Sequence, residues 1–249
     1  MDIRLKPVRL AHLALAVLAL LAVFLLLVRE LDWRPPFRSG SAVAPNAAAT
    51  AVHFSPPSGI YEQAIDVELS SSNKDAAIYF TADGSIPTPE TGTLYTGPIH
   101  IPADQPRVPV MRARAALPDG ELGPVASATY FLNVDADIPL VSLIVDPQDL
   151  WSKDSGIFAN PHFKGREWER ESDVFYYDPQ QGIGLGVPAG VRVHGAGSRD
   201  YDKKSLRLYF RNEYGQPFLD HQVFPDSDKQ RFKRLVVHDG GQDFPAVSV

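Results

Sequence analysis

The apolar run from Leu10 to Val28 constrains the fold of this 249-residue chain more than any other feature. It consists almost entirely of Leu, Ala, Val and Phe, with His12 as its one polar residue. A helix that crosses a bilayer needs about 20 such residues, whereas the core of a secretory signal peptide has about 7–15. Arg29 and Glu30 follow directly, in place of small residues suited to cleavage. We therefore expect an uncleaved transmembrane anchor at 10–28, embedded in a lipid bilayer; a buried core helix is the alternative.

The residues that flank this run predict the orientation of the anchor. Three basic residues lie within the segment 1–9, and three arginines after the run are accompanied by two acids. The positive-inside rule counts Lys and Arg near a span and largely ignores acids, so it gives a modest preference. Residues 29–52 are rich in Pro, Ala, Ser and Gly and predict an extended linker. We expect a single-pass protein with residues 1–9 in the cytoplasm and its folded domains outside.

Charge and residue counts exclude several classes of function. The net charge is −6, which makes general nucleic-acid binding an unsuitable role. The chain has no cysteine, so it has no disulfide, thiolate metal site or cysteine nucleophile. Its histidines show no metal-ligand spacing, and we assign no metal site. These properties are compatible with a bacterial envelope protein.

Short β segments separated by turn signals fill the region 53–133. In residues 65–70 apolar and polar side chains alternate, as in a strand with one solvated face. Other candidate strands are 76–80, 99–101, 108–116 and 127–132, with an Asp-Gly turn at 83–84. Several short strands at this spacing predict a small antiparallel, Ig-like β-sandwich.

The segments FSPPSGIY, AAIYFTADGSIP, LYTGPI, RARA and ATY follow one another in this region. They resemble the chitobiase/β-hexosaminidase C-terminal type of module, also called the GH29D-like β-sandwich. The resemblance covers 53–133 and implies a non-catalytic accessory domain. Tyr79, Tyr95 and Asp83 could contact a sugar through stacking and a carboxylate. A structural role is favoured, because Tyr79 lies in a predicted strand and Asp83 begins a turn whose backbone its side chain can bind.

A second unit begins at 138. Residues 139–145 predict a buried strand, 149–151 a short helix, and 154–158 a loop. Further strands are predicted at 167–177, 190–194 and 204–211. Asp239 begins a polar segment, 239–243, that reads equally well as a ligand loop or a plain turn. His194 beside a glycine could act as a base, but a place on the surface or in a turn is favoured.

The stretch 191–210 carries the chemistry of this unit. Gly195, Gly197 and Ser198 can leave backbone N–H groups pointing outward, and Arg199 and Lys204 add positive charge beside them. Such an arrangement suits an anionic ligand such as a phosphate.

The two-residue period of the strand predicted at 204–211 places the adjacent residues Lys203 and Lys204 on opposite faces. It places Lys204 on the face of Leu206 and Leu208, where an unpaired charge is costly, and Lys203 on the solvated face with Arg207. In the alternative interpretation Lys204 pairs with an internal carboxylate and Arg199 caps the turn.

The segments IPLVSLIVDPQDLW, SGIF, WERE, GVRVHGAGSR, KKSLRLYFR and RLVVHDGGQD occur in this order. They resemble the spore-coat-protein-H (CotH) kinase family over 138–249. The resemblance implies an ATP- and Mg²⁺-dependent protein kinase whose substrates are secreted or surface proteins. It also implies that Gly195, Gly197, Ser198 and Arg199 form a glycine turn near the nucleotide and that Lys204 contacts its phosphates.

Phosphoryl transfer also needs acids to hold Mg²⁺ and a carboxylate to orient the attacking hydroxyl. We expect these acids beyond the present sequence and assign no catalytic residue within it. The expected fold is mainly β: a transmembrane helix, an Ig-like sandwich, and an incomplete α+β kinase-like domain that is inactive as this fragment. The alternative is a non-catalytic, tethered β-sandwich protein that acts in adhesion, spacing or carbohydrate contact.

Overall fold

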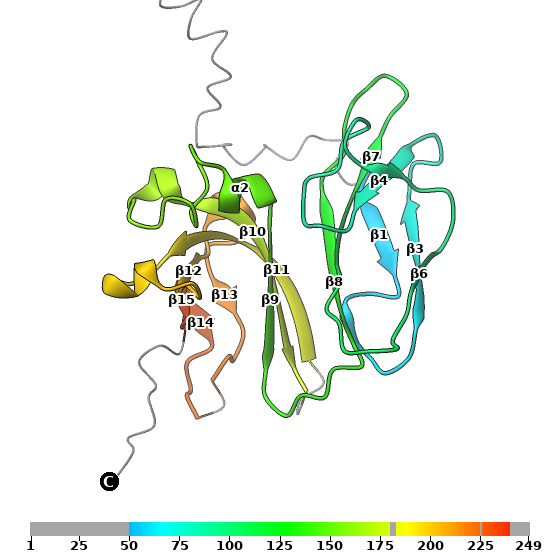
Figure 1. Ribbon diagram of the computed structural model, residues 1–249. Helices are drawn as coiled ribbons and strands as arrows, with labels where there is room; N and C mark the ends of the chain where they lie inside the picture. Colours follow the sequence, from blue (N-terminus) through cyan, green and yellow to red (C-terminus); the bar gives the residue numbers. More distant parts are fainter. Residues whose placement is uncertain (1–49, 180–182, 225, 240–249) are drawn as a thin grey trace, which may run out of the picture. The chain divides into compact units, whose positions relative to one another are not determined.

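The computed structural model describes residues 50–179, 183–224 and 226–239 (Figure 1). The predicted anchor at 10–28 and most of the predicted linker lie outside these residues. Within the described ranges no helix is long and apolar enough to cross a membrane. The last predicted linker residue, Val52, already belongs to the first strand.

Eight strands between Val52 and Leu132 form two sheets. The first sheet has the order β1-β3-β6, with β1 at Val52–Ser55, β3 at Ile65–Ser71 and β6 at Ile99–Ile101. The second has the order β2-β8-β7-β4-β5, with β2 at Gly59–Tyr61, β8 at Ala126–Leu132, β7 at Val110–Ala116, β4 at Ala77–Thr81 and β5 at Thr93–Leu94. Side chains of both sheets meet in one core, so this module is a β-sandwich (Figure 1).

The alternation predicted for residues 65–70 produces this core. Val67 and Leu69 are buried, while Asp66, Glu68 and Ser70 are exposed. From the other sheet, Met111 and Tyr130 pack into the same cluster. The expectation of a wholly antiparallel sandwich is wrong at one point, because β2 pairs with β8 in parallel. After β1 the chain crosses from the first sheet to the second, where β2 pairs with β8, the last strand of the module.

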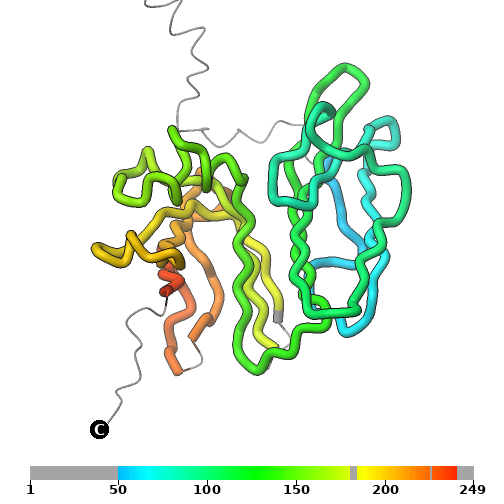
Figure 2. Tube along the Cα trace, viewed as in Figure 1, coloured from blue at the N-terminus to red at the C-terminus, as the bar shows by residue number. Residues whose placement is uncertain are grey.

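The second module contains a five-stranded antiparallel sheet of order β15-β12-β11-β10-β9. These strands are β9 (Leu140–Val145), β10 (Arg170–Asp178), β11 (Ile183–Val193), β12 (Leu206–Tyr209) and β15 (Arg234–Val237). A separate two-stranded ribbon pairs β13 (Leu219–Asp220) with β14 (Arg231–Phe232). Figure 2 follows the chain through this module, from β9 in green to the orange and red segments near β15.

Helical structure in the described residues is short. It comprises α2 (Pro147–Trp151) and the 3-10 turns η1 (Arg166–Trp168), η2 (Gly197–Asp200) and η3 (Asn212–Tyr214). The described part of the chain is therefore mainly β. The helix predicted near 149–151 is confirmed, and Asp146 caps it by accepting a hydrogen bond from Gln148 N.

Two strand predictions in this module are too long. The strand predicted at 167–177 begins only at Arg170, because the preceding residues form η1. The strand predicted at 204–211 is β12, and Lys204 precedes it with its ammonium bonded to loop carbonyls.

One face of the second sheet carries its own hydrophobic core, formed by Val174, Val191, Leu208 and their neighbours. The opposite face contacts the sandwich along β9 and β10. There the guanidinium of Arg112, whose side chain is 6 % exposed, donates to Ile144 O and to Asp173 Oδ2. Asp173 also accepts from Ser127 Oγ at 2.6 Å. Side chains on the outward face of β7 and β8 therefore contact the second module.

Candidate functional site

The loop between β11 and β12 contains all five residues predicted to bind phosphate. Gly195 has φ +112°, a conformation that side-chain-bearing residues rarely adopt, and a Cβ there would collide with Ser198 Oγ. Gly197 and Ser198 begin the turn η2. A Cβ at Gly197 would meet no atom within 4 Å, so the chain is open on that side.

Arg199 holds the loop together. Its side chain is buried, and its Nε donates to Gly195 O at 2.7 Å and its Nη2 to Val193 O at 2.8 Å. Its Nη1 donates to Pro161 O. Burial, followed by the nearby Arg192, lowers the pKa of the Arg199 guanidinium. These contacts match the alternative in which Arg199 caps the turn. Because all three acceptors are neutral carbonyl oxygens, they do not cancel the positive charge of Arg199.

Lys204 is bound by carbonyl groups. Its Nζ donates to Arg199 O and Tyr201 O, both at 2.9 Å. No ion pair joins Lys204 to a carboxylate of the described residues, which differs from the alternative that gave it an internal acid. An ammonium has three donors, so these two bonds orient Lys204 and leave it one further donor. Lys203 is exposed, as predicted.

Arg207 and His194 are partners on the outer face of the sheet. Arg207 Nη2 lies 3.2 Å from His194 Nε2, and both residues are half-buried. Arg207 therefore lies on the face predicted for it, but it is only partly exposed and has a side-chain partner. Burial, and then the charge of Arg207, lowers the pKa of His194, so Nε2 of the neutral ring accepts a hydrogen bond from Arg207. The strand register could have revealed this cluster, because Arg192 is the direct partner of Arg207.

A buried ionic network beside this loop was missed by sequence reasoning. Glu169 has a side chain that is 0 % exposed, and it accepts both Arg211 Nε at 2.7 Å and Arg211 Nη2 at 3.0 Å. Tyr214 donates its hydroxyl proton to the same carboxylate at 3.0 Å. The hydrogen bonds that Arg211 donates to Glu169 raise the pKa of Arg211. The network fixes η3 to the start of β10 and stabilises the outer face.

The predicted loop at 239–243 is described only at its first residue. Asp239 N donates to Ser205 Oγ at 3.0 Å, so the polar segment begins beside β12. Among the described residues no cluster of three or more His, Cys, Asp or Glu side chains could hold a metal ion.

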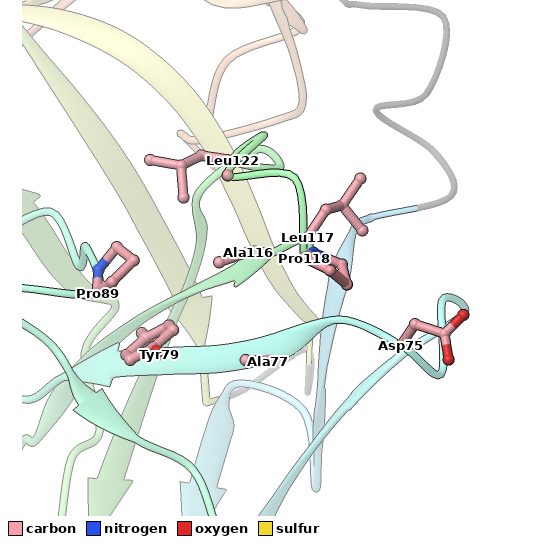
Figure 3. Close-up of a pocket in the computed structure, with 9 residues that line it drawn as sticks. Asp75, Ala77, Tyr79, Pro89, Ala116, Leu117, Pro118 and Leu122 are labelled. Atoms are coloured by element: carbon pink, nitrogen blue, oxygen red, sulfur yellow. The ribbon is translucent and has the colours of Figure 1, made fainter.

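The sandwich has a shallow groove of about 320 Å³, and Tyr79 lines it (Figure 3). In Figure 3 its ring lies beside Pro89, with Ala77 farther along the same strand and Asp75 at one end. Tyr95 lines a different groove.

Asp83 accepts hydrogen bonds from the amide and hydroxyl of Ser85, which lower its pKa. Its predicted structural role is confirmed. The three residues considered for sugar contact therefore do not form one site.

The fold and the loop together define a mainly β chain in which one sandwich packs against a second sheet with a basic hairpin. Residues 56–116 match the family model described as the chitobiase/β-hexosaminidase C-terminal domain. The match runs from the turn before β2 to the end of β7, and it agrees with the resemblance of the same segments in the sequence. No curated protein and no solved structure gives a match.

Proposed function

We propose that the second module is the N-terminal part of a CotH-type protein kinase domain and that the loop 195–204 binds nucleotide phosphates. The sandwich is its non-catalytic accessory module, and the segment 10–28 anchors the protein in a membrane. The substrates are secreted or surface proteins. The observation that carries this proposal is the ammonium of Lys204, oriented by two carbonyls with no acidic partner among the described residues.

The residues present suit the phosphate part of ATP. The Lys204 ammonium and the backbone N–H groups at Gly197 and Ser198 would hold phosphate oxygens, while Arg199 fixes the loop from below. When bound, ATP supplies the phosphoryl group. Mg²⁺ needs carboxylate ligands, and the described residues offer no cluster for it, so no residue is assigned to the metal.

The test is ATP affinity, measured by titration calorimetry on the 249-residue chain in detergent. Replacing Lys204 by Ala removes a charge-assisted hydrogen bond, and we expect the affinity to fall about tenfold or more. Lys203→Ala is the matched control, because it removes an adjacent but exposed lysine and should change affinity less than about twofold. Equal affinity of the Lys204→Ala variant and the parent chain rejects the proposal.

A second candidate function rests on the family match and the groove at Tyr79. In this account the protein is a tethered, non-catalytic β-sandwich that contacts carbohydrate. A partly exposed aromatic ring in a groove that also contains the Asp75 carboxylate is a suitable, though small, platform for a sugar. Titration with chitooligosaccharides tests it: Tyr79→Ala should abolish binding and Tyr95→Ala should not. Saccharide binding without ATP binding would favour this candidate over the kinase.

A further inference from the structure

Three arginines gather at the end of β11 and the start of β12. Arg192 and Arg207 are directly opposite each other on paired strands, on the face away from the core. Arg199 reaches the same region from η2, where it donates to Val193 O. Like charges directly opposite each other on neighbouring strands are destabilising unless a counter-charge is present.

Arg192 has an acidic neighbour, since its Nε lies 3.5 Å from Glu169 Oε2. Arg199 donates to carbonyl oxygens only. Arg207 contacts the neutral ring of His194, and no carboxylate of the described residues forms an ion pair with it.

The acidic side chains of the neighbouring elements are engaged elsewhere. Asp200 of η2 contacts His162, and Asp239 after β15 contacts His238. Glu169 also receives the paired donors of Arg211. The guanidinium of Arg207 is thus left without an acidic partner in the part of the chain described.

Arg207 is partly exposed. Its neighbour on the next strand is Val236, which is 45 % exposed. Solvent therefore reaches the outer face of the sheet beside Arg207. Only one of the two terminal nitrogens of Arg207 is used by His194, and a guanidinium presents its donors as a fork.

We propose that Arg207 is the contacting residue of an anion site on this face and that the site takes a phosphate group. His194 is its positioning residue, because its Nε2 holds one side of the Arg207 fork and turns the other outward. The planar fork matches two phosphate oxygens. The inference rests on the proposed function only for the class of ligand, since Lys204 plays no part in it. The phosphate belongs to a nucleotide or to a phosphorylated protein side chain.

The lowered pKa of His194 fits this arrangement. Burial, and then the charges of Arg207 and Arg199, disfavour its protonation. A bound phosphate would offset those charges, so the pKa of His194 should rise when the site is filled. The rise reports a phosphate near His194, and the Arg207 variants below assign it to Arg207.

The experiment titrates the full chain with inorganic phosphate while the ring proton signals of His194 are followed by NMR over pH 5 to 8. We expect saturable binding and a rise in the pKa of His194. Arg207→Gln should weaken phosphate binding about tenfold or more. Lys203→Gln, which removes one exposed charge from the same hairpin, should weaken it less than about twofold.

Arg207→Lys keeps the charge but loses the fork, and intermediate binding is expected. His194→Ala should weaken phosphate binding more than His194→Gln, whose side-chain oxygen can still accept from Arg207. Thermal unfolding of each variant identifies any that fails to fold. Phosphate binding that is equal in the parent chain, Arg207→Gln and Lys203→Gln overturns the proposal, as does an unchanged pKa of His194 at saturation.

Two further titrations identify the source of the phosphate. Binding of ATP that depends on Arg207 assigns the site to a nucleotide, and binding of a phosphoserine peptide that depends on Arg207 assigns it to a modified protein. If Lys204→Ala leaves ATP binding intact while Arg207→Gln abolishes phosphate binding, the nucleotide role of Lys204 is wrong and the anion site stands. The reverse result retains Lys204 and rejects Arg207.

Discussion

At the scale of single residues, the loop between β11 and β12 depends on the backbone conformation of Gly195 and on the guanidinium of Arg199. Gly195 adopts a positive φ, and Arg199 donates to the carbonyl oxygens of Gly195 itself and of Val193. The sequence allowed both roles to be predicted as alternatives, since glycines permit such turns and a buried arginine needs acceptors. It did not show that Lys204 would donate to carbonyls, because those acceptors are created only when the loop closes.

Gly195→Ala is expected to destabilise the fold by about 1–3 kcal/mol, because the new Cβ meets Ser198 in a left-handed backbone conformation. Chemical denaturation measures the change. Gly197→Ala is the matched control: its Cβ enters open space, and we expect a change below about 0.5 kcal/mol. A larger loss at Gly197 than at Gly195 would contradict the described loop.

Glu169→Gln is expected to cost about 3–5 kcal/mol, because it leaves the charge of Arg211 without its buried partner. Glu68→Gln, an exposed position on β3, should change the free energy of unfolding by less than about 0.5 kcal/mol. Urea unfolding of both variants provides the comparison. Equal stabilities would show that the Glu169 network does not stabilise the second module.

At the scale of elements, period-two alternation predicted the strand at residues 65–70, which corresponds closely to β3. The strand predicted as buried at 139–145 corresponds closely to β9. The strands β1, β2 and β5 have 4, 3 and 2 residues, too few for a period to be visible. Their pairing is set by the rest of the sheet, so the parallel placement of β2 could not be read from local sequence.

The pairing of β10 with β11 depends on aromatic rings placed opposite glycines. Phe175 pairs with Gly186, and a Cβ at Gly186 would lie 2.7 Å from the Phe175 ring. Gly186→Ala should therefore destabilise the chain by about 1–3 kcal/mol. In a Phe175→Leu background the same substitution should cost less, which a double-mutant cycle measures. Additive effects would indicate that the ring does not cover Gly186.

At the scale of the whole described chain, the sandwich and the second sheet share a polar interface. Thr129 and Phe131 on the outward face of β8 are 0 % and 5 % exposed, and Thr129 bonds Ser142 of β9 at 3.1 Å. The sequence predicted two successive units but not their contact. Arg112 and Asp173 are 61 residues apart, and neither position stands out in a local pattern.

Arg112→Met is expected to cost about 3–5 kcal/mol, since it removes a buried cation that bonds Gly84 O, Ile144 O and Asp173. Arg114→Met on the same strand is the control with a smaller expected loss, because Arg114 bonds Gly123 within the sandwich. Adding Asp173→Leu to Arg112→Met should recover part of the stability. Calorimetry that shows no loss for Arg112→Met would contradict a shared interface.

Sequence patterns thus predicted the mainly β character of the described chain, and the resemblance of the sandwich module agrees with the family model that matches residues 56–116. The stretch of glycine, serine and basic side chains predicted a turn between two strands, and it lies in the loop between β11 and β12. Arg207 and Glu169 were missed, since their importance comes from cross-strand register and from partners up to 45 residues away.

The account is tested most directly by mapping backbone amide NMR shifts of the full chain as ATP is added. It predicts saturable changes concentrated at Gly195, Gly197, Ser198 and Lys204, which are lost in Lys204→Ala and retained in Lys203→Ala. The sandwich groove at Tyr79 should show none. No change in the loop at saturating ATP, or changes confined to the sandwich, would contradict the proposed nucleotide site.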